Sequence, residues 1–545
     1  MFWFRFACEG KAGLIMQTSR RLPYLVLALC SILYFAPFLR ILSQNGDEGT
    51  LIDGAVRVAE GQVPFRDFFE VMGPGTFYWL ALFFKLLGTT WFASRICLLV
   101  TTVAITVVLY YLARRLHPGL GAVPVIFFVA VSFHSWNAIS HHMDSTLFGL
   151  LAFLAFVYWM DRANPGEDCA NPGEVRRPYA LFLAGIAAGL TSWIMLPKGV
   201  LLCLSFVLLL WMLYRKEPIF WTSLGVLLGG YLLVMAIVVT MFWLAGGLRD
   251  MIHANLIWPL TNYGGANGVP YGLEFQQMYW TAFTMSLREV VSPVTSNAIS
   301  GFLSVPFIVV MGLPLVLLAL CVRYRRSAFD RATLPYWVAG CAFWLSEMHR
   351  KDLVHIVFGS PLFILLAFYY CRRLRARAVS YALQLVAICA VALAMLNPLV
   401  ALAANHKMLT RRGTLYQFEG DPVLAFLNAR VRPGEAVFVY PYAPMYYFLS
   451  AAKNPTRYSF LMYCYDTDAQ FREVVRSLED NQVRYVVWDR SFPERVTTWF
   501  PTYHISPDKM IVEPYLAEHY TVIGGAGHGW QFLERKESMA ASWRP

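Results

Sequence analysis

The chain has 545 residues, of which 58% are hydrophobic and 14% charged, with a mean hydropathy of +0.49 and a net charge of +11. Soluble proteins carry about a quarter charged residues, so this composition excludes a soluble enzyme and indicates a polytopic membrane protein. The basic residues fall in short connections between apolar runs rather than on one surface, which argues against nucleic-acid binding.

Eleven apolar runs approach the ~20 residues that cross a bilayer. Residues 1–21 before them lack the features of a cleavable signal, and Met16 is an alternative start. If the N-terminus is cytoplasmic, alternate connections collect the arginines and lysines, as the positive-inside rule requires. We therefore expect a multi-pass protein of the cell inner (plasma) membrane with its C-terminal region outside. The predicted spans are residues 22–42, 93–116, 119–138, 143–161, 179–196, 198–214, 219–245, 302–323, 333–347, 354–371 and 378–404.

The connections on the cytoplasmic side are short and rich in arginine. Their basic residues are Arg114, Arg115, Arg176, Arg177, Arg215, Lys216, Arg323, Arg325, Arg326, Arg372, Arg373, Arg375 and Arg377.

The first outer loop, residues 43–92, opens with Gln44-Asn45-Gly46-Asp47-Glu48-Gly49. Helical spacing of apolar residues follows over 50–60, and Gly61 is placed to end that helix. Residues 75–87 are apolar and aromatic but short, which favours a helix lying in the membrane interface.

A second long outer loop covers residues 246–301 and is rich in aromatic residues among glycines and asparagines. Such rings serve either a sugar site or an interfacial aromatic belt, and the belt is the commoner use. The rings in question are Trp258, Tyr263, Tyr271, Tyr279 and Trp280.

From about residue 405 the pattern changes to that of a small α/β domain, so we divide the chain into 1–404 and 405–545. Short buried strands are predicted at 436–440 and 483–488, with further strands at 520–523 and 531–533. An amphipathic helix is predicted at 469–481.

Asp47 and Glu48 are the first candidate catalytic residues, because they lie where a membrane ends and water begins. A partly desolvated carboxylate suits the removal of a proton from a hydroxyl. The simpler alternative is that Asp47 only caps the following helix. Asp144, at the outer end of a span, allows the same two interpretations. With His141 and His142, these carboxylates could also hold a divalent metal ion.

Cations on the outer side form the second candidate group. Lys198 lies between two apolar runs, and Arg350, Lys351 and His355 lie in one outward connection with His349. Such residues can anchor the chain at phospholipid headgroups, or can bind a specific lipid-linked phosphate.

Several of these segments resemble the GT-C superfamily of membrane glycosyltransferases, especially bacterial protein O-mannosyltransferases and lipid A aminoarabinose transferases. Asp47-Glu48, with Ala59-Glu60-Gly61-Gln62-Val63-Pro64 and Asp67-Phe68-Phe69 after it, is similar to that superfamily's first outer loop. Gly73-Pro74-Gly75-Thr76-Phe77-Tyr78-Trp79 resembles its juxtamembrane helix, although one of two prolines is missing. Lys198-Gly199 resembles the end of the stretch that carries the donor-phosphate lysine, while Lys351, His355 and Pro361 resemble a Lys-x3-Tyr motif with His in place of Tyr.

The resemblance implies a mostly α, polytopic GT-C fold of about eleven transmembrane helices with a small C-terminal α/β extracytoplasmic domain. It also implies inverting transfer of a sugar from a polyprenyl-phosphate donor to a hydroxyl of an acceptor lipid, glycan or protein. In that scheme Asp47 is the base, Glu48 or Asp144 orients the acceptor or a metal, and Lys198, Arg350 and Lys351 stabilise the leaving phosphate. Candidate secondary or acceptor contacts are Arg66, Asp67, Glu70, Tyr78 and His142.

Three alternatives remain open from the sequence. An oligosaccharide polymerase or ligase using a diphosphate carrier is the nearest. A lipid or polysaccharide transporter would place charged residues near the bilayer midplane, often in repeated halves, whereas here they crowd one face. A non-catalytic scaffold would not need a carboxylate pair beside outward cations.

Overall fold

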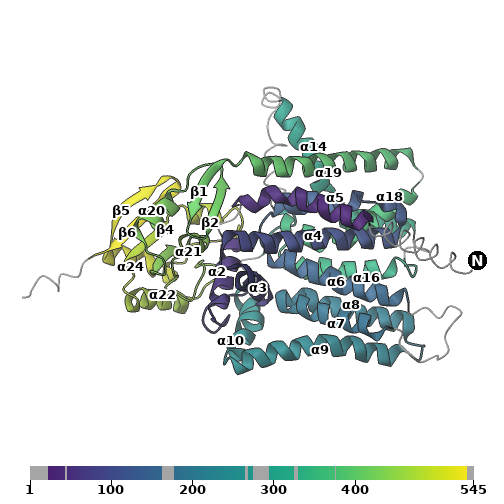
Figure 1. Cartoon of the computed structure of the whole chain (residues 1–545), viewed down its shortest axis with the longest axis horizontal. Helices are drawn as coiled ribbons and strands as arrows, with labels where there is room; N and C mark the ends of the chain where they lie inside the picture. The colour runs from purple at the N-terminus through teal and green to yellow at the C-terminus, as the bar shows by residue number, and fades with distance from the viewer. Residues whose placement is uncertain are drawn as a thin grey trace, which may run out of the picture.

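A computed structural model of the chain describes residues 22–42, 46–162, 177–263, 268–273, 294–324, 329–374 and 376–536. A helical bundle is followed by a small sheet at one end, which confirms the expected mostly α fold with a C-terminal α/β part (Figure 1). Some residues named above lie outside the described ranges. They are residues 1–21, Gln44, Asn45, Arg176, Tyr279, Trp280, Arg325, Arg326 and Arg375.

Within the described ranges, six helices are long and apolar enough to cross a membrane, or up to eight if each of two bent pairs is one span. One pair, α14 (Val294–Met311) and α15 (Leu313–Arg323), bends by 61°. The other, α17 (Leu353–Gly359) and α18 (Pro361–Arg373), bends by 68°. The six single helices are Leu22–Arg40, α4 (Trp91–Leu116), α6 (His141–Met160), α8 (Leu196–Tyr214), α9 (Phe220–Leu244) and α19 (Arg377–Ala403).

Each of the predicted spans contains a helix, but some of these helices are short or broken. The short ones are α5 (Val123–Ser135), α7 (Pro178–Ile194) and α16 (Leu334–Glu347). The break between α17 and α18 falls at Ser360-Pro361, because proline lacks the N–H that would continue the helix. The helices therefore occur where the apolar runs predict them, and fewer than eleven are long enough to span alone.

The last turn of α4 carries arginines, Arg114 and Arg115. The start of α4 contacts the C-terminal part, because the Trp91 N–H donates to the Arg412 carbonyl at 2.7 Å. The 26 residues of α4 then extend about 39 Å at 1.5 Å per residue. At the other end of α4, Arg115 pairs with Asp161 at 2.7 Å. The basic end of α4 thus lies far from the C-terminal part.

The first outer loop forms two helices, α2 (Asp47–Ala59) and α3 (Gly75–Leu87), next to the C-terminal part (Figure 1). Both were predicted, and α2 begins earlier than expected, at Asp47. Gly49 allows α2 to touch α21 (Met445–Ser450), since a Cβ at Gly49 would lie 2.4 Å from the Met445 nitrogen. The loop and the C-terminal part therefore pack directly on each other.

The C-terminal part contains a four-stranded sheet of order β3-β4-β6-β5, in which β3 and β4 are parallel and the other pairs antiparallel. All four strands and the amphipathic helix lie where they were predicted; a preceding hairpin, β1 and β2, was not predicted. The helix α22 (Asp468–Asp480) starts with a Thr467/Gln470 capping box. The remaining elements are β1 (His406–Thr410), β2 (Gly413–Gln417), α20 (Pro422–Arg430), β3 (Val437–Tyr440), β4 (Tyr485–Asp489), α23 (Phe492–Val496), α24 (Val512–His519), β5 (Tyr520–Ala526) and β6 (Trp530–Arg535).

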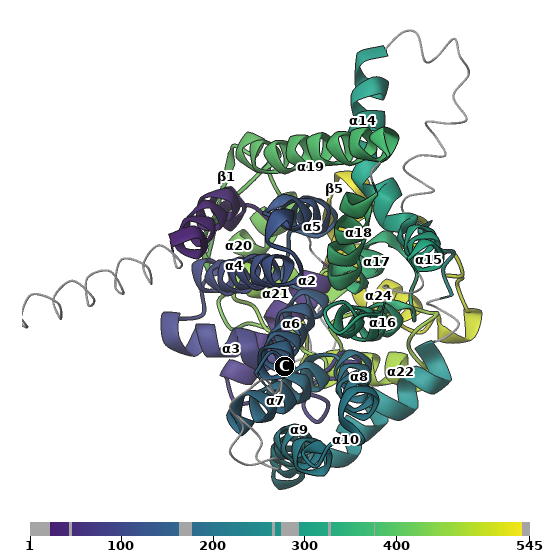
Figure 2. The ribbon, with the colours of Figure 1, turned by 90° about the vertical axis from the view of Figure 1, so that its right-hand side faces the viewer.

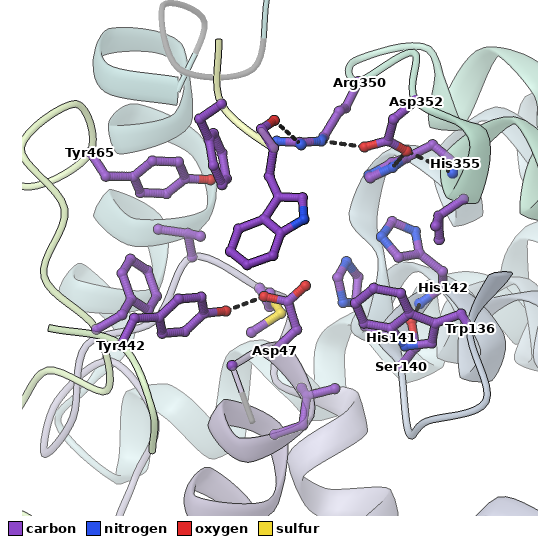
Figure 3. Close-up of a pocket in the computed structure, with 18 of the residues that line it drawn as sticks. Asp47, Trp136, Ser140, His141, His142, Arg350, Asp352, His355, Tyr442 and Tyr465 are labelled. Atoms are coloured by element: carbon purple, nitrogen blue, oxygen red, sulfur yellow. Dashed lines mark hydrogen bonds and ion pairs between the residues drawn. The ribbon is translucent and has the colours of Figure 1, made fainter. Parts of the chain in front are cut away.

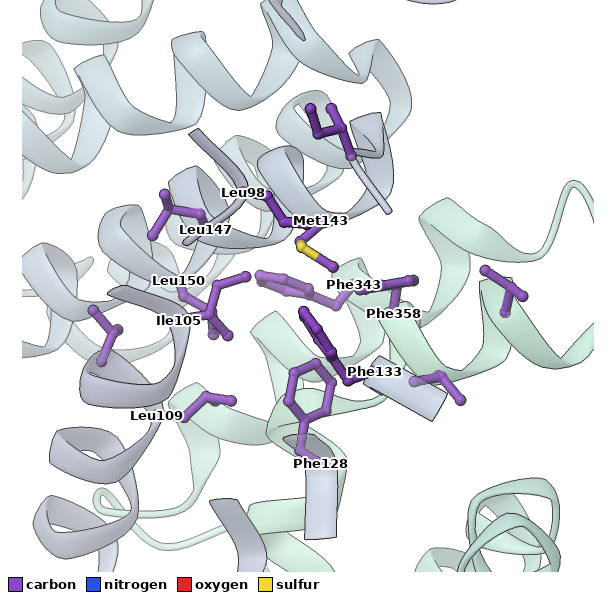
Figure 4. Close-up of a cluster of buried hydrophobic side chains, with 14 of the residues drawn as sticks. Leu98, Ile105, Leu109, Phe128, Phe133, Met143, Leu147, Leu150, Phe343 and Phe358 are labelled. Atoms are coloured by element: carbon purple, nitrogen blue, oxygen red, sulfur yellow. The ribbon is translucent and has the colours of Figure 1, made fainter. Parts of the chain in front are cut away.

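The bundle core lies around α6, which is near the middle of the end-on view, whereas α9 and α19 lie at opposite edges (Figure 2). Of the most apolar part of α6, 72% is buried, compared with 22% for α9. Apolar side chains of α4, α5, α6, α16 and α17 meet there, among them Ile105, Phe133, Met143 and Phe343 (Figure 4). This core fixes the ends of the same helices, from which the site described below is built.

Candidate active site

A cavity of about 610 Å³ lies between the loops at one end of the bundle and the C-terminal part. We call it the central cavity. Its walls are mostly aromatic and aliphatic with a limited set of polar groups, as is usual for sites that bind small molecules. The polar and charged residues on its walls are Asp47, Ser135, Ser140, His141, His142, Asn255, His349, Arg350, Asp352, His355, Tyr442, Tyr465, Asp489 and Arg495.

Asp47 lines the cavity as the first residue of α2, and its carboxylate accepts a hydrogen bond from the Tyr442 hydroxyl (Figure 3). The N-cap of α2 is Gly46 and no side chain caps the helix, so the interpretation of Asp47 as a cap is wrong. A Cβ at Gly46 would lie 2.8 Å from the Tyr442 ring, so glycine leaves room for that ring. Burial and the neighbouring Asp47 raise the pKa of Tyr442 well above its usual value, so the hydroxyl stays a donor.

Arg350, Asp352 and His355 form a charged group on the other side of the cavity (Figure 3). Arg350 forms an ion pair with Asp352, whose second oxygen lies 2.6 Å from His355 Nδ1. Burial opposes ionisation of Asp352, but His355 and Arg350 more than offset it and hold the pKa of that carboxyl well below its usual range. Arg350 also donates to the Trp499 carbonyl at 2.5 Å. A guanidinium fixed in this way at a cavity wall suits the binding of phosphate oxygens.

Glu48 lies outside the lining of the central cavity. It is fully buried, pairs with the equally buried Arg95 of α4, and accepts the N–H of Ile139 at 2.9 Å. Burial raises the pKa of Glu48 and Arg95 lowers it again. In this position the carboxylate joins α2 to the bundle, and a role of Glu48 in orienting the acceptor stays a prediction.

Asp144 also lies outside the cavity lining, buried between helices of the bundle. The Thr101 hydroxyl donates to Asp144 Oδ1 at 3.4 Å, whereas the N-cap of α6 is Ser140. Asp144 is therefore not the cap of α6, and it does not line the central cavity.

Lys198 is fully buried in an ion pair with Glu347, at 2.5 Å between Nζ and Oε1. It also donates to Ser145 at 3.1 Å and Thr146 at 3.2 Å. A lysine that reached the interface would have an exposed ammonium group, so the anchor interpretation is wrong. Lys198 does not line the central cavity, and its contact with donor phosphate stays a prediction.

The remaining candidates for phosphate and secondary contacts lie outside the lining of the central cavity. Lys351 is exposed, Arg66 and Asp67 pair with each other at 2.7 Å, and Tyr78 stacks on Trp193 with ring centroids 5.2 Å apart. None of these five residues lines the central cavity.

Glu70 is fully buried and lies near Tyr442. Burial raises the pKa of Glu70 to about 8. Glu70 is therefore largely protonated at neutral pH, and it does not line the central cavity.

The metal site expected from His141, His142, Asp144 and Asp47 or Glu48 does not assemble. The two histidines line the cavity with ring centroids 4.0 Å apart, but Asp144 and Glu48 are turned to Thr101 and Arg95. Trp258 of the second long loop is likewise buried, packed against Phe69 and Tyr465, and is neither a belt residue nor an exposed sugar platform.

The C-terminal part supplies cavity residues that the sequence analysis missed. Tyr442 follows β3, and Asp489 ends β4 and pairs with Arg495. Because β3 and β4 are parallel, their carboxyl ends meet at one edge, where open α/β sheets usually bind ligands. The polar residues that follow the two predicted strands could therefore have indicated this part of the cavity. The missed aromatic residues in this part are Tyr442, Phe460, Tyr465, Phe492, Trp499, Phe500 and Trp530, and Trp136 after α5 was missed as well.

No protein-family model matches the sequence, and no curated protein is significantly similar to it. Solved structures are similar in fold. ArnT from Cupriavidus metallidurans bound to undecaprenyl phosphate has a TM-score of 0.54 at 12% identity, over 96% of this chain and 99% of ArnT. Apo ArnT has a TM-score of 0.53 at 13% identity, over 95% and 98%.

An archaeal oligosaccharyltransferase, AglB from Archaeoglobus fulgidus in complex with an inhibitory peptide and a dolichol-phosphate, has a TM-score of 0.50 at 12% identity. The match covers 96% of this chain and 75% of AglB. At such identities the likeness concerns the fold. The short motifs of the outer loops predicted the same architecture, and this chain is a polytopic helical protein with the fold of ArnT and AglB.

Proposed function

We propose that the chain is a membrane glycosyltransferase that moves a sugar from a polyprenyl-phosphate carrier to an acceptor hydroxyl. The observation that carries the proposal is that Asp47 and Arg350, a carboxylate and a guanidinium, line one cavity. Undecaprenyl phosphate and dolichol-phosphate in the ArnT and AglB structures support a lipid phosphate as the donor's carrier.

In this scheme Asp47 removes the proton of the acceptor hydroxyl, and the oxygen forms a bond to C1 of the sugar. The bond between C1 and the phosphate oxygen breaks, and its electron pair leaves with the phosphate. Attack from the face opposite the leaving group inverts C1. Arg350 stabilises the negative charge of the departing phosphate, since a fixed guanidinium in an apolar cavity needs little reorganisation.

The arginines in the last turn of α4 support an orientation. Arg115 lies at the end of α4 away from the C-terminal part, and arginines favour the cytoplasmic side. The central cavity then opens on the outer face of the membrane, where acceptor lipids, glycans or secreted proteins are found.

The test uses membranes from cells that lack the protein, supplied with the full chain or a variant. Undecaprenyl-phosphate-linked mannose, glucose and arabinose, each radiolabelled, are the donor probes, and the label released from the carrier into any other fraction is measured. Because general base catalysis contributes about 10²- to 10⁴-fold, Asp47→Asn should lower transfer at least about 100-fold.

The matched control is Asp468→Asn. Asp468 likewise begins a helix, α22, and is partly exposed, but it does not line the cavity. Full activity of Asp47→Asn with normal membrane insertion would refute the assignment. Transfer only from diphosphate-linked oligosaccharides, included as a separate arm, would instead favour a polymerase or ligase.

A further inference from the structure

A second cluster on the cavity wall joins three segments of the chain. His142 begins α6, Glu347 ends α16 and His355 lies in α17. Each offers one ligand atom, and these atoms all lie within 4.8 Å of one another. The three residues are 6%, 0% and 9% exposed, so little water reaches them.

Two side chains contact the Glu347 carboxylate, one at each oxygen. Lys198 holds one of its oxygens at 2.5 Å, while the other lies 2.9 Å from His142 Nδ1. These last two atoms therefore interact directly, and a cation bound by both would take the place of that contact. The convergence of two imidazoles and a carboxylate in so small a buried space is the arrangement in which proteins hold transition-metal ions.

His355 has the support that metal-binding histidines usually have. Its Nδ1 lies 2.6 Å from Asp352 Oδ1, and Arg350 holds the same carboxylate. A carboxylate on one ring nitrogen fixes the ring and leaves the other nitrogen for a metal. The rings of His142 and His355 are 4.4 Å apart between centroids, and each offers one ring nitrogen to the cluster.

We propose that His142, Glu347 and His355 bind one divalent transition-metal ion, and that their chemistry favours Zn²⁺. Two imidazoles and a carboxylate match three-ligand zinc sites, which keep a further coordination position open. Calcium and magnesium prefer sites made only of oxygen ligands. His142 and His355 line the central cavity, so the open position faces it.

The charge around this site indicates what the open position takes. Glu347 is already paired with Lys198, and Asp352 with Arg350. A divalent ion therefore adds positive charge that these carboxylates do not balance, and an anionic oxygen from the cavity is its natural fourth ligand.

Zinc binding is tested on the full chain, purified in detergent without a histidine tag and stripped of metal with a chelator. After addition of Zn²⁺ and desalting, elemental analysis should find about one ion per chain, and the thermal unfolding midpoint should rise. His142→Ala and His355→Ala should lose this ion, whereas His141→Ala should keep it. His141 is the matched control because it lines the same cavity but is not part of the cluster.

Cobalt provides a second measurement that needs no variant. Co²⁺ added to the stripped wild-type chain should give visible absorption bands of nitrogen and oxygen coordination, and Zn²⁺ should remove them. Absence of binding in the folded wild type, or one ion retained by folded His142→Ala and His355→Ala, would overturn the proposal. Neither measurement involves sugar transfer, so the outcome is independent of the test of Asp47.

Discussion

The hydrogen bond between Tyr442 and Asp47 leads to a quantitative expectation for Tyr442→Phe. The substitution removes one oxygen and leaves the ring, which packs against Phe460 with centroids 5.5 Å apart. Asp47 and Tyr442 are 395 residues apart in the chain, so the hydroxyl is the means by which the C-terminal part fixes the carboxylate. Without it, the Asp47 side chain is free to turn about its own bonds.

Hydrogen bonds to charged groups contribute about 1.5–3 kcal/mol. If this energy serves to aim the carboxylate at the acceptor hydroxyl, its loss lowers kcat by about 10- to 100-fold, because 1.4 kcal/mol is a factor of ten. KM for the lipid donor should change little, since Arg350 and the apolar wall are untouched.

The assay is transfer from the radiolabelled undecaprenyl-phosphate sugar that the wild type uses, at saturating and limiting donor. Tyr515→Phe is the control, because it removes a similar bond, from Tyr515 to Glu479 at 2.6 Å, away from the cavity. A Tyr442→Phe enzyme within twofold of the wild type, or one that changes only in KM, would refute the reasoning.

Two further predictions concern buried ionisable groups outside the cavity lining. Arg95→Leu leaves Glu48 buried without its partner and should cost about 3–5 kcal/mol of stability, measured by thermal unfolding in detergent, while Arg95→Leu with Glu48→Leu should recover most of it. Burial raises the pKa of Glu70 from 4.5 to about 8. Between these pH values the folded chain holds a proton that the unfolded chain has lost. The free energy of unfolding therefore falls with rising pH, by up to about 1.4 kcal/mol per pH unit. Glu70→Gln should remove this fall. The thermal unfolding midpoints of variant and wild type should be equal near pH 5, and the variant should be the more stable near pH 8. A constant difference between the two midpoints at all pH values would contradict the prediction.

Local sequence was sufficient for most of the secondary structure. Apolar runs determine the bundle helices because lipid leaves a chain few ways to satisfy its backbone. The hairpin β1–β2 escaped prediction because most of its side chains are exposed and show no alternating burial. Prolines such as Pro361 shorten or break some of the predicted spans. How far a proline shortens a helix depends on how the neighbouring chain packs, which the sequence alone does not show.

The candidate site was only partly accessible from the sequence. Asp47, Arg350, His355 and His142 were identified and do line one cavity. Lys198 shows what the sequence did not reveal. Its position between two spans predicted a phosphate contact, whereas in the structure it pairs with Glu347, which lies 149 residues later in the chain. Pairing between distant helices decides whether a charged group faces a ligand or another side chain, and one sequence does not contain that information.

The cavity takes its walls from nearly the whole length of the chain, from Asp47 to Trp530. Synthesis runs from the N-terminus, so Asp47 is in place with the early helices while Tyr442 and Trp530 have yet to be translated. A nascent chain therefore has an unfinished site until its last strand, β6, folds against β4. The bundle alone, even if correctly inserted, lacks the group that holds Asp47, and a late nonsense mutation would leave an inserted protein with an incomplete cavity.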